Sequence, residues 1–125
     1  MVDRPKVKFV AIVDDDASVR TALLGLMRAA GLTAQAFTSA EEYLRSGVSS
    51  ETACLVADVR MPGMSGLDLQ AHLNALGAEI PVVFITAHGD AAARARAMQA
   101  GAVRFLQKPF DDEELLASIH EATKT

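Results

Sequence analysis

The sequence alternates short apolar runs with longer stretches of helical periodicity. Four runs are almost wholly apolar, and a weaker extended segment follows the first; together they cover residues 7–13, 33–37, 54–57, 82–85 and 103–106. Runs of this length that are bounded by polar turns predict strands. Because the four strong runs are apolar on both faces, they predict a parallel sheet that helices cover on each side.

Helical stretches separate these strands, and a fifth helix follows the last one. The segment 18–30 keeps its large apolar residues on one face and stops before Gly31, a residue type that commonly follows a helix end. Ser39 to Glu42 has the pattern of a capping box, which predicts the start of a second helix. The remaining helices are expected at 65–76, at 90–100, and from 111 or 112 onward.

Strand and helix therefore alternate five times, which predicts an α/β fold with right-handed crossovers. We expect a doubly wound, flavodoxin-like (βα)₅ arrangement with a five-stranded parallel sheet. The strand order 2-1-3-4-5 is the common order for such sheets and is taken from that class of fold. The length of 125 residues predicts one domain over 1–125.

The composition of the chain indicates which kinds of partner and which compartment are expected. The net charge of -4 and the lack of clustered Lys and Arg argue against direct nucleic acid binding. The single cysteine, Cys54, lies in an apolar run, which indicates a buried structural residue and a reducing compartment. Without an 18-residue apolar stretch or a signal-peptide core, we expect no membrane association and a cytoplasmic location.

Polar residues follow the carboxyl ends of four predicted strands. Asp14 to Asp16 follow the first strand, Asp58 the third, Thr86 the fourth and Lys108 the fifth. In an open parallel sheet these ends share one rim, where ligands bind beside the point at which the strand order reverses. The sequence therefore predicts one acidic pocket that four strands build together.

Three crowded carboxylates, those of Asp14, Asp15 and Asp58, repel one another unless a cation neutralises them. Mg²⁺ binds oxygen ligands and commonly combines one or two carboxylates with phosphate oxygens, whereas the scattered histidines and one cysteine form no zinc pattern. Lys108 adds a compact positive charge for phosphoryl oxygens, and Thr86 adds a hydroxyl. A cis peptide before Pro109 would aim the lysine inward.

Four segments resemble the ordered motif set of bacterial response-regulator receiver domains, most of all the FixJ-type branch. They are Ile12–Asp16, Asp58–Gly66, Phe84–Asp90 and Phe105–Phe110. The resemblance spans essentially the whole chain. It implies a two-component signalling switch in which Asp58 accepts a phosphoryl group from a sensor histidine kinase in a Mg²⁺-dependent reaction.

The resemblance also implies roles for single residues. The implied metal ligands are Asp14, Asp15, Asp58 and the backbone carbonyl of Arg60. Lys108 pairs with the phosphate, Thr86 is the switch hydroxyl, and Phe105 is the switch aromatic. The chain is expected to catalyse only its own phosphorylation and dephosphorylation and to be no enzyme otherwise. Asp16 has a simpler reading as a helix cap, and His88 as a surface residue near the pocket.

Members of the FixJ-type branch usually carry a helix-turn-helix output domain, and none is present in this sequence. The resemblance therefore implies control of transcription through an output domain outside this chain, or a stand-alone receiver. The expected fourth helix has six alanines and Met98 as its one large apolar residue. We expect it to pack loosely, with a stripe of Ala91, Ala95 and Met98 facing the sheet and the charged Arg94 on that stripe.

Loose packing predicts that phosphorylation moves this helix. The face made by helix 4, strand 5 and helix 5 then changes shape and binds a partner, which we expect to be a second copy of the domain in a symmetric homodimer. The residues expected on this face include Arg94, Arg96, Arg104 and Gln107.

Two other functional classes remain open at this point. A haloacid-dehalogenase-like phosphatase would use Asp14 and Asp16 as its aspartate-x-aspartate motif, but this leaves Asp58 unexplained. A pseudo-receiver would keep the fold as a binding module without phosphorylation. Covalent phosphorylation, and the aspartate on which it depends, separates the three.

Overall fold

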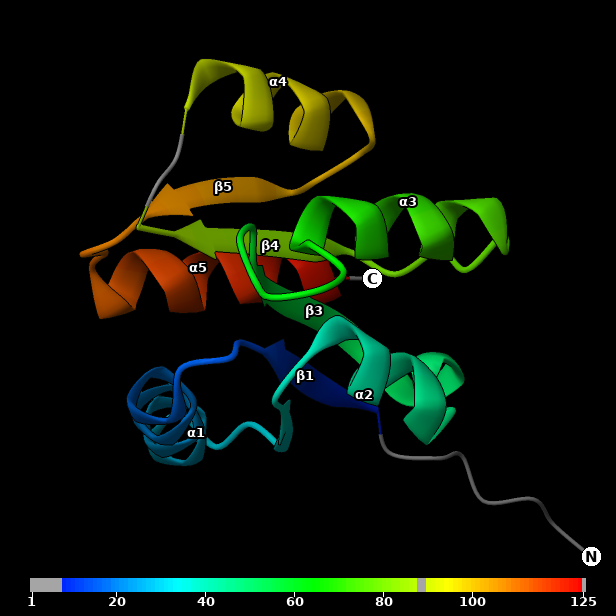
Figure 1. Cartoon of the computed structure of the whole chain (residues 1–125). Coiled ribbons are helices and arrows are strands. Elements are labelled where there is room, and N and C mark those ends of the chain that lie inside the picture. The colour runs from blue at the N-terminus through cyan, green and yellow to red at the C-terminus, as the bar shows by residue number, and fades with distance from the viewer. Residues whose placement is uncertain (1–7, 88–89, 125) are drawn as a thin grey trace, which may run out of the picture.

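A central five-stranded sheet organises the computed structural model, which describes residues 8–87 and 90–124 (Figure 1). The strands are β1 (Phe9–Val13), β2 (Ala34–Phe37), β3 (Thr52–Asp58), β4 (Val82–Thr86) and β5 (Arg104–Gln107). The helices are α1 (Ala17–Ala29), α2 (Ala40–Ser46), α3 (Gly66–Ala75), α4 (Ala91–Gln99) and α5 (Asp112–Thr123), with a short 3₁₀ turn at Ser49–Glu51. Each expected element is present, and its ends lie within two residues of the expected ones.

The strands are all parallel and follow the order β2-β1-β3-β4-β5, which confirms the predicted fold class. Helices α2, α3 and α4 cover one face of the sheet, and α1 and α5 cover the other (Figure 1). Successive strand residues alternate between the two cores: Ala11 and Val13 contribute to the first, and Val10 and Ile12 to the second. This two-sided burial explains why the strands read as continuous apolar runs.

Every α-helix begins after a polar residue whose side chain accepts a backbone N–H of the first turn. These N-cap residues are Asp16, Ser39, Ser65, Asp90 and Asp111. The capping box predicted for α2 is half formed. The hydroxyl of Ser39 accepts the N–H of Glu42 at 3.0 Å, but the Glu42 carboxylate accepts the N–H of Thr38 and not that of Ser39.

The face that α4 presents to the core differs from the expectation. Ala97 is the buried residue of this helix and Ala93 is partly buried, whereas Ala91, Ala95 and Met98 are exposed, so the predicted stripe is wrong. Small side chains on the inner face bring α4 close to α3, where the Gln70 amide donates to the carbonyl of Ala97 at 3.1 Å. The expectation of few large apolar contacts holds, because the buried residue of the helix is an alanine.

Within 8–87 and 90–124, no helix combines the length and the apolar character that a membrane span requires.

Candidate functional site

Asp14 and Asp58 lie side by side where the strand order reverses. Val13, the last residue of β1, pairs with Ala57 of β3, so the following residues, Asp14 and Asp58, occupy matching positions on neighbouring strands. Both carboxylates are buried. The sheet topology therefore builds the acidic pair that the sequence predicted at this rim.

Lys108 joins the two carboxylates. Its Nζ donates to Oδ2 of Asp14 at 3.2 Å and to Oδ2 of Asp58 at 3.1 Å. The backbone N–H of Lys108 donates to the carbonyl of Thr86 at 2.7 Å, which continues the pairing of β4 with β5, and the Lys108–Pro109 peptide is cis. Four strands thus converge on one cluster.

Burial, hydrogen bonds and neighbouring charges all shift the pKa values in this cluster. Burial raises the pKa of Asp14 above its ordinary value; the N–H of Asp16 and the charge of Lys108 oppose that rise, while the charge of Asp58 adds to it. For Lys108, partial burial lowers the pKa, but the hydrogen bonds and charges of Asp58 and Asp14 outweigh it, and the net shift is upward. Lys108 is therefore held as a cation beside the two acids.

Short turns fix the carboxylates in place. Oδ1 of Asp14 accepts the N–H of Asp16 at 2.9 Å, and Oδ1 of Asp58 accepts the N–H of Arg60 at 3.1 Å. Asp15 is exposed, yet one of its carboxylate oxygens lies within 4.8 Å of oxygens from both Asp14 and Asp58. These three residues can hold a metal ion, because clustered carboxylate oxygens are ligands that hard divalent cations prefer.

Asp16 acts as the helix cap that its position suggested. Its carboxylate accepts the N–H of Ser18 at 2.9 Å and the Ser18 hydroxyl at 2.7 Å, and it lies outside the three-carboxylate group. These hydrogen bonds lower the pKa of Asp16. His88 lies outside the described residues.

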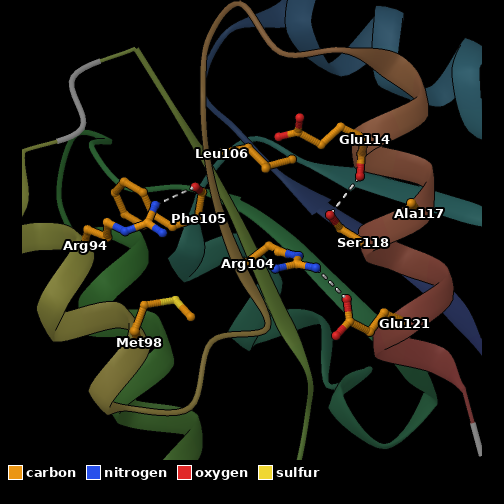
Figure 2. Close-up of a pocket in the computed structure, with 9 residues that line it drawn as sticks. All are labelled: Arg94, Met98, Arg104, Phe105, Leu106, Glu114, Ala117, Ser118 and Glu121. Carbon is orange, nitrogen blue, oxygen red and sulfur yellow. Dashed lines mark hydrogen bonds and ion pairs between the residues drawn. The ribbon is translucent and has the colours of Figure 1, made fainter.

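Thr86 and Phe105 occupy the neighbouring strands β4 and β5. Thr86 is fully buried at the last position of β4. Phe105 is also buried, with its ring centroid 6.2 Å from that of Phe84 and an angle of 48° between the rings. On the outer side of β5, the guanidinium of Arg94 donates to the Phe105 carbonyl at 3.3 Å (Figure 2).

Two side chains that the sequence did not single out support the loops of the site. Nη1 of Arg20 donates to the carbonyl of Asp14 at 2.9 Å, from within α1. Oε2 of Glu41, on α2, accepts the N–H of Met64 at 3.0 Å in the loop that follows Asp58. Arg20 was detectable in principle, because it lies six residues after Asp14; Glu41 gave no local signal, since the contact joins residues 23 positions apart.

A doubly wound parallel sheet with a buried Asp pair, a bridging lysine and a cation-binding carboxylate group defines the class of this protein. Residues 10–120 match the family described as "Response regulator receiver domain". The chain belongs to this family, and it is the receiver domain of a two-component response regulator.

Similar proteins place the chain near FixJ, as the sequence predicted. Nodulation protein W of Bradyrhizobium diazoefficiens is 51% identical over 115 residues, which are 92% of this chain and 51% of that protein. Transcriptional regulatory protein FixJ of Azorhizobium caulinodans is 46% identical over 110 residues, 88% of this chain and 52% of that protein. The chain thus spans about half the length of these relatives.

Solved structures agree with these relationships. The low-resolution structure of the response regulator StyR matches with a TM-score of 0.88 and 47% identity, over 94% of this chain and 60% of that one. The crystal structure of FixJ-N matches with a TM-score of 0.84 and 37% identity, over 99% of this chain and 96% of that one. The fold and the family therefore rest on sequence and structure together.

Proposed function

We propose that Asp58 is the phosphoacceptor of this receiver domain, within a single functional unit that covers 1–125. The observation that carries the proposal is the convergence on Lys108 Nζ, which lies within 3.2 Å of both Asp14 and Asp58. An acid beside a fixed cation offers a nucleophilic oxygen together with a charge that neutralises incoming phosphoryl oxygens.

Receiver domains of response regulators interact with histidine kinases, and we propose a kinase phosphohistidine as the donor. In the transfer, a carboxylate oxygen of Asp58 forms a bond to phosphorus while the phosphorus–nitrogen bond breaks, and the nitrogen keeps the electron pair. No proton has to leave the attacking carboxylate, so no general base is required. Lys108 and the Thr86 hydroxyl bind the transferred oxygens.

We further propose that the metal ion is Mg²⁺. Oxygen donors alone make up the three-carboxylate cluster. Mg²⁺ prefers such donors and commonly completes its coordination with waters and phosphate oxygens. The residues that would hold it are Asp14, Asp15, Asp58 and the backbone carbonyl of Arg60. When bound, the ion neutralises charge on the transferring phosphoryl group. Arg60 N–H already binds Asp58 Oδ1, which fixes the turn that presents the Arg60 carbonyl.

Intact-mass measurement after incubation with acetyl phosphate tests the assignment. We expect the wild type to gain one phosphoryl group only when Mg²⁺ is present, and Asp58→Asn to gain none while it keeps its circular dichroism spectrum. A phosphatase that uses Asp14 would instead lose phosphorylation with Asp14→Asn and retain it with Asp58→Asn. A pseudo-receiver would show no phosphorylation in any variant.

We propose that phosphorylation is read out through Thr86, Phe105 and α4. Phe105 is already buried in this structure, so its response is a repacking against Phe84 and not a movement in from solvent. Helix α4 has little apolar anchorage, which keeps an alternative placement within a few kcal/mol. The partner surface is the face of α4, β5 and α5.

A groove of about 440 Å³ runs along this face (Figure 2). Arg94 and Arg104 line one side, and Glu114 and Glu121 of α5 line the other. Arg96, which we had expected on this face, instead pairs with Asp68 on α3 at 3.1 Å. The two sides meet in an ion pair between Arg104 and Glu121 at 3.1 Å within the chain (Figure 2). A two-fold interface can exchange this pair for the same pair between copies, because each copy then sets its arginines against the acids of the other.

Sedimentation with beryllofluoride and Mg²⁺ tests the homodimer. We expect the wild type to increase in mass, Arg104→Glu to stay monomeric, and the control Arg28→Glu, at the end of α1, to behave as the wild type. A wild type that remains monomeric would refute this interface. By analogy with the transcriptional regulatory protein FixJ, we infer that this receiver controls transcription through an output domain outside the chain; the alternative is a stand-alone receiver.

A further inference from the structure

A carboxylate from α2 holds the loop that follows the phosphoacceptor. The loop connects Asp58 at the end of β3 to Gly66 at the start of α3. Oε2 of Glu41 accepts the N–H of Met64 in this loop at 3.0 Å. The contact joins a helix that takes no direct part in the acidic cluster to the segment that carries the Arg60 carbonyl.

The lack of a side chain at Gly63 leaves room for the Glu41 carboxylate. Its φ of +77° is a left-handed conformation that favours glycine, and a Cβ at this position would collide with Oε2 of Glu41. The carboxylate thus occupies the space in which a side chain at residue 63 would lie. The glycine and the acid form a matched pair that brings α2 against the loop.

The charge of Glu41 suits its position. The N–H of Met64, followed by the N–H of Glu41 itself and by the charge of Arg45, lowers the pKa of Glu41, so the group is ionised at neutral pH. A charged acceptor makes a shorter and stronger hydrogen bond than a neutral one. Glu41 also lies in the first turn of α2, where the helix dipole favours a negative charge.

The other carboxylate oxygen, Oε1, is shielded from solvent, and among the described residues it has no hydrogen-bond partner. The side chain is therefore held through its other oxygen, Oε2, which accepts the N–H of Met64. A glutamine here would keep an acceptor for Met64 but would place an NH₂ group where Oε1 meets no acceptor. Glutamine should consequently support the loop less well than glutamate and better than alanine.

We propose that Glu41 is a positioning residue that sets the Mg²⁺ affinity of the site. It acts through the loop: holding Met64 restricts the path of the chain from Asp58 and so the place of the Arg60 carbonyl relative to the carboxylates. Groups behind metal ligands contribute in this way because a preoriented ligand loses less freedom on binding. The proposal rests on the metal site proposed above and adds its regulation by α2.

Titration of the metal-free protein with Mg²⁺, followed by NMR amide shifts, tests this role. We expect Glu41→Ala to raise the dissociation constant about tenfold, the low end of the cost of losing an outer partner, with Glu41→Gln in between. Hydrogen exchange of the Met64 amide in metal-free protein should be faster in Glu41→Ala. Glu42→Ala is the matched control. It removes one negative charge from the same helix turn, but the carboxylate that it removes accepts hydrogen bonds from Thr38.

The outcomes separate the two proposals. If the wild type binds no Mg²⁺, or if Asp58→Asn binds Mg²⁺ as tightly as the wild type does, the proposed metal site itself is wrong. If binding depends on Asp58 but Glu41→Ala and Glu42→Ala both match the wild type, the role of Glu41 is wrong and the metal site stands. Thermal denaturation confirms that each variant is folded at the temperature of titration.

A double-mutant cycle with Gly63→Ala keeps the test independent of any one variant. Strain from the positive φ weakens Mg²⁺ binding in both backgrounds, but the collision with Glu41 exists only when the carboxylate is present. We therefore expect Gly63→Ala to raise the dissociation constant by a larger factor in the wild type than in Glu41→Ala. Equal factors in the two backgrounds would overturn the proposed coupling.

Discussion

The Nζ atom of Lys108 lies 3.1 Å from Oδ2 of Asp58, although 50 residues separate them in the chain. The lysine therefore links Asp58, the proposed phosphoacceptor, directly to the end of β5. We predict that Lys108→Ala is still phosphorylated by acetyl phosphate but no longer transmits the change to β5, because the link from phosphate to strand is gone. NMR amide shifts with and without beryllofluoride would measure the transmission.

Lys124→Ala, an exposed change after α5, is the control and should respond as the wild type does. If Lys108→Ala shows β5 and α4 shifts as large as those of the wild type, the lysine does not couple the site to the face.

The raised pKa of Asp14 predicts how the stability of the protein depends on pH. Because its folded-state pKa is raised, the folded protein holds this proton more tightly than the unfolded chain; the resulting stabilisation is present at low pH and is lost as pH rises through the folded pKa. In metal-free buffer, Asp14→Asn should therefore raise Tm at about pH 7 and have little effect at about pH 3. Thermal denaturation across this range measures the difference.

The exposed Asp15→Asn serves as the comparison and should change Tm less than Asp14→Asn at neutral pH. A lower Tm for Asp14→Asn at about pH 7 would mean that attraction to Lys108 outweighs burial.

Two glycines should respond to alanine in opposite directions. At Gly66 a Cβ would collide with the backbone carbonyl oxygen of Asp58 and press on the Phe84 ring, so Gly66→Ala should destabilise the fold by about 1–3 kcal/mol. At Gly25, exposed within α1, a Cβ meets nothing within 4 Å, and Gly25→Ala should stabilise by about 0.5–1 kcal/mol. Urea denaturation gives both values, and equal effects of one sign would contradict the packing described.

Helix α4 should be loosened by removing its link to α3. Gln70 is buried and donates to the carbonyl of Ala97 at 3.1 Å, which also accepts the N–H of Ala102 at 3.0 Å. Gln70→Leu removes one of these two hydrogen bonds, at a cost of about 0.5–1.5 kcal/mol. Because the side-chain link between α3 and α4 is lost, we expect faster amide hydrogen exchange in α4, with little change in β1. Asn74→Ala, which removes an exposed bond to Ala100, should have a smaller effect. Unchanged exchange in α4 would show that apolar packing alone fixes the helix.

The helices and strands of this protein were predictable from the sequence, but the inward face of α4 was not. Strands buried on both faces leave continuous apolar runs, and N-caps such as Ser65 and Asp90 mark helix starts. In α4, however, alanine appears on every side, so the pattern could not distinguish the buried Ala97 from the exposed Ala95. Only the position of α3, with Gln70 directed at Ala97, shows which side faces inward.

The sequence by itself determined the α/β class, the single acidic pocket and its main members, because strand ends in a parallel sheet must share a rim and each member sits just after an apolar run. Tertiary structure alone decided the contacts between elements: Lys108 with both Asp14 and Asp58, and Glu41 with Met64. Local patterns encode burial and turns over a few residues. Contacts across 23, 50 or 94 positions depend on how the sheet and helices pack, and no local pattern records that packing.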